Sequence, residues 1–174
     1  MKKLLSIIAV CLLAAACNYS GTSEKKDSII TKPSGENLSM PYEAVYSTNF
    51  EIGNPKYAQI VLNIYKDYDN NAFNHSDAYA DTVSMKGADG GTIRGKDVLI
   101  NALKKYRNSI KSIRDTVDTY VVLKPKDKDE TWVSVWSHET NTYKNGKIET
   151  IKFNENWEFN KAGKVAFISV YTAK

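Results

Sequence analysis

The first strongly patterned stretch of the chain begins at Asn54. Asn54 and Pro55 are typical of a helix start, because asparagine caps free amide groups and proline suits the first helical turn. Apolar residues then recur at steps of three and four positions, as on one face of an amphipathic helix: Ala58, Val61, Leu62, Tyr65 and Tyr68. The pattern stops at residues 70–71. The sequence therefore predicts a helix that ends near residue 69.

A second helical pattern covers residues 96–109, where the apolar positions again share one face. These positions are Val98, Leu99, Ala102, Leu103 and Tyr106. Between the two helices, the sequence predicts a short helical turn at residues 73–79 and a brief strand at residues 81–86. Four glycines then mark a loop up to residue 95.

From Ile110 onward the pattern is that of strands, with predicted spans at residues 114–124, 131–144, 147–160 and 164–173. In the first span, alternation places Val117, Val121 and Leu123 on one side. It also places Asp115 and Asp118 on opposite faces, which excludes a carboxylate pair there. Helices followed by strands indicate an α+β fold, with one curved antiparallel sheet wrapped around the N-terminal helices.

Asn145-Gly146 is a strong signal for a hairpin with a two-residue loop. Such a loop would pair Lys144 with Lys147 and place Trp136 opposite Glu155. One face of the hairpin would then carry eight residues, which are Trp132, Ser134, Trp136, His138, Phe153, Glu155, Trp157 and Phe159. We expect this aromatic face to be the concave one, covered by the helices. The opposite face, which includes Lys152, Asn154 and Asn156, is more polar.

The N-terminus has the pattern of a targeting segment. Two lysines precede an apolar run from Leu4 to Ala16, which is too short to span a membrane as a helix. Its end, Leu13-Ala14-Ala15-Ala16-Cys17, resembles a bacterial lipoprotein signal, in which the cysteine becomes the acylated first residue. The alternative is an ordinary secretion signal followed by a coincidental cysteine. We expect a signal peptide at residues 1–16 and an anchor at Cys17.

Residues 17–40 are rich in polar residues, and their composition predicts a flexible tether between the membrane and a domain at residues 41–174. Within that domain, residues 42–52 are aromatic and are expected to pack on its surface. The net charge is +4, and removal of residues 1–16 would reduce it to +2. No basic stripe remains that would indicate nucleic-acid binding.

Composition also restricts the chemistry of the folded part. Of 174 residues, 42% are hydrophobic, which excludes wholesale disorder. Both cysteines, Cys11 and Cys17, lie near the N-terminus, which excludes a disulfide framework, a thiolate zinc site and a cysteine nucleophile in the domain. With His75 and His138 as the two histidines, we expect no metal site, and nothing indicates a cofactor.

The order of helix, short helix, strand, glycine loop, helix and long strands resembles the cone-shaped fold of the nuclear transport factor 2-like (NTF2-like) superfamily. This group includes ketosteroid isomerases, scytalone dehydratase, SnoaL-type polyketide cyclases and non-catalytic binding domains. The resemblance covers residues 55–171. It is carried by Tyr79-Ala80-Asp81, by Gly91-Thr92-Ile93-Arg94-Gly95-Lys96-Asp97 and by the stretch from Glu155 to Val165. The region of residues 42–71 also resembles small lipoproteins of Bacteroidetes-type bacteria.

The resemblance to ketosteroid isomerases implies that Glu155 occupies the place of a neutral acid that donates a hydrogen bond to a developing oxyanion. The carboxylate base of those enzymes is replaced here by Lys86 and Gly87. Their phenolic donor on the first helix falls near Asn63, and Tyr65 is expected on a different face. One of the three catalytic parts is therefore present.

Each candidate residue has a structural alternative. Glu155 in an aromatic wall is a candidate acid, base or ligand anchor, or a structural hydrogen-bonding glutamate. His138 is a candidate general base or an inert strand-end residue. His75 is expected to be a surface or capping residue. Pocket candidates are Asn63, Trp136, Phe153 and Trp157, and the aromatic members of this set are equally suited to a closed core.

We therefore expect a lipid-anchored domain of the bacterial cell envelope, at the outer membrane or the periplasmic face. It would bind a small apolar ligand in a cone-shaped pocket, or a partner protein, including a second copy of itself, through its sheet face. The alternative is an isomerase-, dehydratase- or cyclase-type enzyme that uses Glu155 and His138. A third hypothesis is a structural envelope protein with a filled core.

Overall fold

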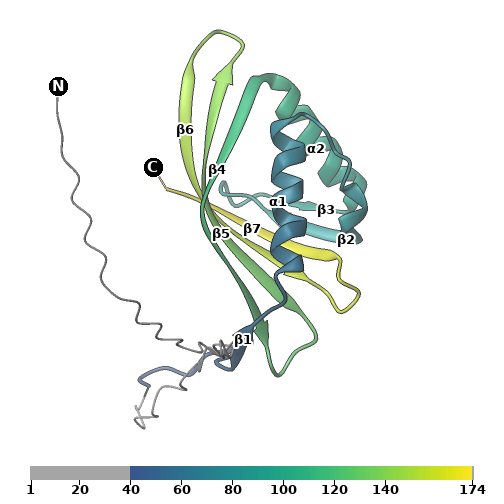
Figure 1. Ribbon diagram of the computed structural model, residues 1–174, viewed down its shortest axis with the longest axis vertical. Coiled ribbons are helices and arrows are strands. Elements are labelled where there is room, and N and C mark those ends of the chain that lie inside the picture. Colours follow the sequence, from purple (N-terminus) through teal and green to yellow (C-terminus); the bar gives the residue numbers. More distant parts are fainter. Residues whose placement is uncertain (1–39, 174) are drawn as a thin grey trace, which may run out of the picture. The chain divides into compact units, whose positions relative to one another are not determined.

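The computed structural model describes residues 40–173 (Figure 1), in which one compact unit begins at Tyr42. The predicted signal peptide, Cys17 and the predicted tether up to residue 39 lie outside the described residues. Within residues 40–173, neither helix has the length and apolar character needed to cross a membrane.

Two helices and a curved seven-stranded sheet form this unit, and the helices lie on one side of the sheet (Figure 1). The elements in chain order are β1 (Phe50–Ile52), α1 (Lys56–Asp69), the 3-10 helix η1 (Ser76–Ala78), β2 (Tyr79–Lys86), β3 (Thr92–Arg94), α2 (Lys96–Ser109), β4 (Ile110–Pro125), β5 (Thr131–Tyr143), β6 (Ile148–Phe159) and β7 (Val165–Ala173). The strand order in the sheet is β1-β4-β5-β6-β7-β2-β3. The predicted α+β class and the positions of both helices are confirmed.

Helix α1 starts where the sequence signals predict. The side-chain oxygen of Asn54 accepts a hydrogen bond of 2.9 Å from the backbone amide of Lys56. Ala58 and Val61 are buried against the core. Helix α2 follows Gly95, whose positive φ of 89° favours a residue without a side chain. The inner faces of both helices therefore meet the concave side of the sheet.

The sheet is mixed, whereas the strand pattern predicts only antiparallel pairing. β2 runs parallel to β7, with Met85 opposite Ile168, and the other neighbouring strands are antiparallel. Because β2 and β7 are joined through the rest of the domain, no hairpin geometry forces them to be antiparallel. β1 pairs with β4, and the hydroxyl of Tyr46 accepts a 2.7 Å hydrogen bond from the Trp132 indole. Tyr46 and residues 50–52 thus pack on the domain as expected, whereas Tyr42 and Val45 are fully exposed.

The predicted register of the β5–β6 hairpin is wrong by one residue. Trp136 lies opposite Asn154, and Glu155 lies opposite Val135. The cause is a three-residue loop: the Gly146 amide donates to the Tyr143 carbonyl at 2.9 Å, and the Tyr143 amide donates to the Lys147 carbonyl at 2.8 Å. Gly146 has a φ of 86°, as in a type I turn followed by a bulge.

This single residue inverts β5, because successive strand residues point to opposite faces. The aromatic and polar set at Trp132, Ser134, Trp136 and His138 lies on the outer face. The inner positions of β5 are Val133, Val135, Ser137, Glu139 and Asn141, all of which are buried. For β6 the prediction is correct, and Phe153, Glu155, Trp157 and Phe159 face inward.

A bulge in β4 has a similar effect. The pairing shifts between Val117 and Thr119, so Val117 stays on the inner face while Val121 and Leu123 turn outward. Val122 instead enters the core and is 5% exposed. The expectation that Val117, Val121 and Leu123 share one side is therefore wrong.

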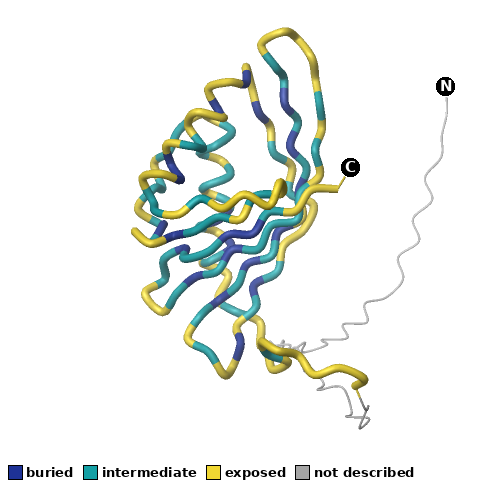
Figure 2. The backbone as a smooth tube through the Cα atoms, turned by 180° about the vertical axis from the view of Figure 1, so that it is seen from behind, coloured by how far each residue is buried: buried dark blue, intermediate teal, exposed yellow. Residues whose placement is uncertain are grey.

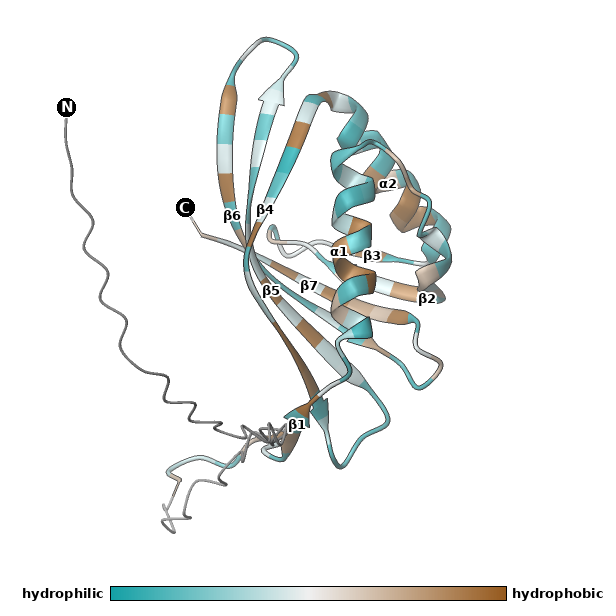
Figure 3. Cartoon of the chain, viewed as in Figure 1, coloured by the Kyte–Doolittle hydropathy of each residue, from teal (hydrophilic) through white to brown (hydrophobic). Residues whose placement is uncertain are grey.

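The core lies between α1, α2 and the concave side of the sheet. Its fully buried members include Val61, Val83, Leu99, Val133, Val135, Phe159 and Val165. Buried positions concentrate in the strands and helices, while the loops that join strands are exposed (Figure 2). Along the strands, apolar and polar residues alternate, as expected for a sheet with one covered face (Figure 3).

A buried guanidinium joins the end of α1 to α2. Arg107, which is 6% exposed, donates from Nε to the Tyr68 carbonyl at 2.9 Å and from Nη2 to the Asp69 carbonyl at 3.0 Å. Its Nη1 donates to the Ile110 carbonyl at 3.3 Å. The side chain therefore satisfies carbonyl groups at the C-terminus of α1, where free acceptors and the helix dipole favour a cation.

We predict that Arg107→Lys lowers the free energy of unfolding by about 2 kcal/mol, because a single ammonium cannot bond three carbonyls in the planar arrangement of a guanidinium. Urea denaturation measures the difference. Arg114→Lys, at an exposed position of β4, is the matched control and should change stability by less than about 0.5 kcal/mol. Equal stabilities of the two variants would contradict the role assigned to Arg107.

Candidate functional site

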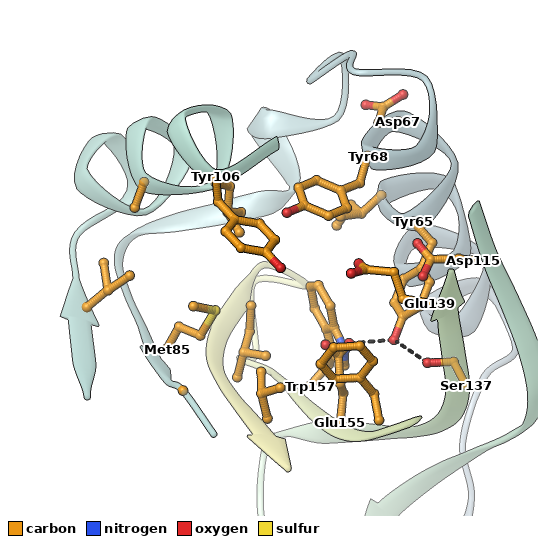
Figure 4. Close-up of a pocket in the computed structure, with 18 of the residues that line it drawn as sticks. Tyr65, Asp67, Tyr68, Met85, Tyr106, Asp115, Ser137, Glu139, Glu155 and Trp157 are labelled. Carbon is orange, nitrogen blue, oxygen red and sulfur yellow. Dashed lines mark hydrogen bonds between the residues drawn. The ribbon is translucent and has the colours of Figure 1, made fainter. Parts of the chain in front are cut away.

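A cavity of about 570 Å³ lies between the helices and the sheet. Its walls come from α1, α2, β2, β6 and β7, with contributions from β4 and β5 (Figure 4). Most of the lining is apolar, and it includes a group of aromatic side chains: Tyr65, Tyr68, Phe73, Tyr79, Tyr106, Phe153 and Trp157. The core is therefore not closed, because the side chains between the two layers leave room for a small molecule.

Glu155 lies at the inner side of this cavity, held by two donors. Its Oε2 accepts a 2.5 Å hydrogen bond from the Tyr65 hydroxyl and a 3.0 Å bond from the Trp157 indole (Figure 4). The Tyr65 hydroxyl also lies 3.5 Å from Oγ of Ser137. These contacts tie α1 to β5 and β6 across the cavity.

Burial raises the pKa of Glu155 above its usual value, although the bonds from Tyr65 and Trp157 act in the opposite direction. Burial and the neighbouring Glu155 likewise raise the pKa of Tyr65, which keeps its proton and acts as the donor. Oε2 of Glu155 thus accepts two hydrogen bonds, while the side chain also lines the cavity.

Four further carboxyl groups line the cavity: Asp115 and Glu139 on the sheet, and Asp67 and Asp89 outside it. Asp115 is half-buried on β4, and its backbone amide donates to Oδ1 of Asp69 at 2.8 Å. Glu139 is 6% exposed on β5, and its Oε1 accepts a 2.6 Å bond from Nδ2 of Asn141. Figure 4 shows the Glu139 carboxyl group pointing into the cavity, on the same side of it as Asp115 and Tyr65.

The surroundings of Asp115 and Glu139 disfavour the ionised form of both carboxyl groups. Burial, together with the like charges of Glu139, Asp69 and Glu155, raises the pKa of Asp115 to about 8. Burial is also the main cause of the raised pKa of Glu139, against which Asn141 and Arg107 act. The protonation of Asp115 can therefore change near neutral pH.

His75 lines the cavity in the loop after α1. Its backbone amide and its Nδ1 both lie near Oδ2 of Asp67, at 2.9 Å and 3.0 Å. The side chain is 43% exposed, which agrees with the expected role near the surface.

Of the residues singled out in the sequence, Glu155, Phe153 and Trp157 line the cavity. Trp136 and His138 do not: the three-residue loop places both on the outer face of β5. Trp136 is 42% exposed there, and Nδ1 of His138 lies 3.1 Å from Oδ1 of Asp118. The structure therefore does not bring His138 and Glu155 together.

Asn63 also lies outside the cavity. It is exposed on α1, in a separate shallow depression beside Leu62 and Tyr120. The phenol placed near Glu155 is that of Tyr65, two residues further along. The helix presents Tyr65 to the cavity because Ala58, Val61 and Tyr65 are spaced by three and four positions, which is one inward stripe.

Sequence reasoning missed Asp115 and Glu139 as cavity residues. Asp115 lies between inward-facing Ile113 and Val117, so the alternation of β4 contains a signal for its direction. Glu139 continues the inward series of Val133 and Val135, but the predicted hairpin register assigns that series to the other face. The exclusion of a pair between Asp115 and Asp118 agrees with the structure, because Asp118 contacts His138 outside.

At the position of the expected catalytic base, Gly87 lines the cavity and Lys86 is exposed. Within residues 40–173, no three histidine, cysteine, aspartate or glutamate side chains are placed so that they could hold a metal ion. The polar side chains that line the cavity are therefore carboxyl groups, phenols, aliphatic hydroxyl groups, the His75 imidazole and one indole.

No protein-family model and no curated protein matches this chain. Solved structures do match. An NTF2-like superfamily protein from Salmonella enterica serovar Typhimurium superposes with a TM-score of 0.59 at 11% identity, over 68% of this chain and 90% of that one. A protein from Xanthomonas campestris described as a polyketide cyclase gives 0.51 at 13% identity, over 67% and 89%.

A third similar structure is TerC co-crystallised with polyporic acid, with a TM-score of 0.56 at 15% identity, over 67% of this chain and 91% of that one. Each of these structures is matched over most of its length, and the identities are low, so the similarity concerns the fold. The resemblance noted in the sequence is confirmed at that level: this chain has the cone-shaped α+β fold of the NTF2-like superfamily.

Proposed function

We propose that this domain binds a small, largely apolar molecule in the cavity between its helices and its sheet. The observation that carries the proposal is the open cavity of about 570 Å³, lined mostly by apolar and aromatic side chains, with Glu155 on its inner side. Sites for small molecules have volumes of about 300–1,000 Å³ and combine apolar walls with a few polar groups that set orientation.

The arrangement of Glu155 supports binding at this place. Tyr65 and Trp157 fix the carboxyl group in one orientation, so a ligand meets a rigid polar group rather than a flexible one. Among proteins of this fold, TerC was co-crystallised with polyporic acid, which supports ligand binding as the function of this domain.

The geometry does not favour proton transfer by Glu155 and His138. His138 contacts Asp118 on the outer face of the sheet, whereas Glu155 lines the cavity on the inner face. An isomerase-, dehydratase- or cyclase-type reaction with this pair of residues is therefore not proposed.

We also propose that the domain is carried at the bacterial cell envelope by acylation of Cys17. The support is the sequence alone: a short basic start, the apolar run up to Ala16 and the small residues before the cysteine. Two or more acyl chains would hold the protein stably at a membrane, since each buried methylene contributes about 0.8 kcal/mol.

A cavity-filling variant tests the proposed binding site. We predict that Val170→Trp weakens binding of the neutral apolar dye Nile red by at least about tenfold, because the indole occupies space inside the cavity. Fluorescence titration measures the affinity. Tyr171→Trp is the control: the neighbouring position lies on the outer face of β7 and is 55% exposed. Equal loss in both variants, or no dye binding by the unmodified domain, would contradict the proposal.

For the anchor, we predict that Cys17→Ser releases the protein from the membrane fraction of a bacterial host, because serine cannot carry the thioether-linked lipid. Cell fractionation followed by immunoblotting measures the distribution. Cys11→Ser is the matched control and should leave the membrane fraction unchanged. Retention of Cys17→Ser in the membrane would show that acylation at this residue is not the anchor.

Pairing of two copies through the outer sheet face stays a prediction. Trp136, Asn154 and Tyr171 lie side by side there on β5, β6 and β7, and both aromatic side chains are substantially exposed. If this face pairs, Trp136→Lys should convert a dimer to a monomer in analytical ultracentrifugation, because it places a charge in the interface. A monomeric unmodified protein would contradict the pairing.

A further inference from the structure

We propose that the ligand of this cavity is an organic cation, such as an amine or a quaternary ammonium with an apolar body. This inference rests on the proposed function and adds the charge of the molecule that is bound. It is drawn from the cavity itself, from carboxyl oxygens of Asp115 and Glu139 that accept no hydrogen bond within residues 40–173, and from the aromatic side chains around them.

The ionisable side chains that line the cavity are mostly acidic. Carboxyl groups of Asp115, Glu139 and Glu155 reach the cavity from three adjacent strands. Among the lining residues in the described part of the chain there is no lysine or arginine. His75 is the basic side chain that lines the cavity, and its Nδ1 is already placed against Asp67 at 3.0 Å.

Two of these carboxyl groups lack the partners that buried acids normally have. Glu139 is 6% exposed, and Asn141 bonds to one of its oxygens. Within residues 40–173, nothing donates a hydrogen bond to its other oxygen, and the group points into the cavity (Figure 4). The Asp115 carboxyl likewise receives no hydrogen bond from these residues. A buried acid in this condition is costly to ionise, and a cation in the cavity would offset that cost.

Aromatic side chains line the same part of the cavity. Tyr68 and Tyr106 come from α1 and α2 and point their hydroxyl ends into the cavity opposite Glu139 (Figure 4). Trp157 contributes its ring from β6. Electron-rich ring faces attract ammonium groups, and the attraction increases when water is excluded. Carboxyl groups and rings together form the surroundings that an ammonium group with an apolar body requires.

Other ligand charges suit this lining less well. An anion would meet several carboxyl groups and no lysine or arginine side chain, so it would be repelled wherever these groups are ionised. A bare metal ion needs three or more ligands at short range, and residues 40–173 contain no such group. A neutral molecule without hydrogen-bonding groups fits the apolar walls but leaves the carboxyl groups of Asp115 and Glu139 without a partner.

Binding of a cation should depend on pH, because it favours the ionised form of the acids. The groups that face Asp115 are Asp69 from α1, Glu139 from β5 and Glu155 from β6, and Arg107 from α2 acts on Glu139. The nearby phenols, which keep their protons near neutral pH, are Tyr65, Tyr68 and Tyr106. Since the pKa of Asp115 is about 8, raising the pH from about 6 to 9 deprotonates it and should strengthen cation binding.

Three probes of one shape test the inference: phenyltrimethylammonium, the neutral isostere tert-butylbenzene and the anion benzenesulfonate. Their affinities are measured by displacement of Nile red from the full chain at several pH values. At pH 9 we expect the cation to bind at least about tenfold more tightly than tert-butylbenzene, and benzenesulfonate to bind most weakly. The cation's affinity should rise between about pH 6 and 9, while that of tert-butylbenzene stays constant.

The double variant Asp115→Asn/Glu139→Gln should remove most of the preference for the cation and change the affinity for tert-butylbenzene by less than about threefold. Asp118→Asn, on the outer face of the same strand as Asp115, is the matched control and should behave like the unmodified protein. Should the double variant fail to fold, the three probes and the pH series on the unmodified protein decide the question alone.

The outcomes separate the two proposals. If Nile red and tert-butylbenzene bind but the cation binds no more tightly at pH 9, the inference of a cationic ligand is overturned and the proposed binding function stands. If neither Nile red nor any probe binds, both are overturned. A preference for the cation that survives in the double variant would overturn the assignment to Asp115 and Glu139.

Discussion

The hydrogen bond from the Tyr65 hydroxyl to Glu155 determines how the helical layer sits on the sheet. A carboxyl group at this depth needs a donor, and α1 supplies it across the cavity at 2.5 Å. The same helix face buries Ala58 and Val61 in the core. A rotation of α1 about its axis would therefore remove the phenol from Glu155 and the aliphatic side chains from their contacts together. The helix position, the orientation of Glu155 and the width of the cavity depend on one another.

Asp115 and Glu139 have fewer hydrogen-bond donors than Glu155. Glu155 has two donors, whereas Asp115 and Glu139 keep free acceptor capacity toward the cavity. Arg107 uses its guanidinium on two backbone carbonyls at the end of α1 and on the Ile110 carbonyl, and it forms no ion pair with either acid. The guanidinium of Arg107 thus stabilises the fold, and the carboxyl groups of Asp115 and Glu139 are left available to a ligand.

Much of the architecture could be predicted from the sequence, because periodicity reports local structure directly. Both helices, the long strands and the inward side of β6 follow from patterns at Asn54, Tyr65 and Phe153. The errors arise where one residue changes the face of a strand. The extra loop residue before Gly146 turned Trp136 and His138 outward, and the bulge after Val117 reversed part of β4. Alternation cannot reveal such insertions, because it continues correctly on either side of them.

Part of the candidate site could be predicted from the sequence, again because alternation reports local structure. Glu155 and Trp157 are two positions apart on one strand, so their shared face needs no knowledge of pairing. Asp115 and Glu139 meet only through the pairing of β4 with β5, where they are opposite each other. That they share one cavity follows only from the registers of β4 with β5 and of β5 with β6, and the hydrophobic pattern alone does not determine these registers.

The parallel pairing of β2 with β7 has a consequence for the order in which the protein folds. Met85 and Ile168 are partners across the sheet although most of the domain separates them in sequence. Contacts between such distant segments form late, since the intervening chain must be closed into a loop first. β7 also supplies Ile168 and Val170 to the cavity wall. A chain interrupted before β7 would therefore contain both helices and the β5–β6 hairpin but no complete cavity, so ligand binding reports that the last strand is in place.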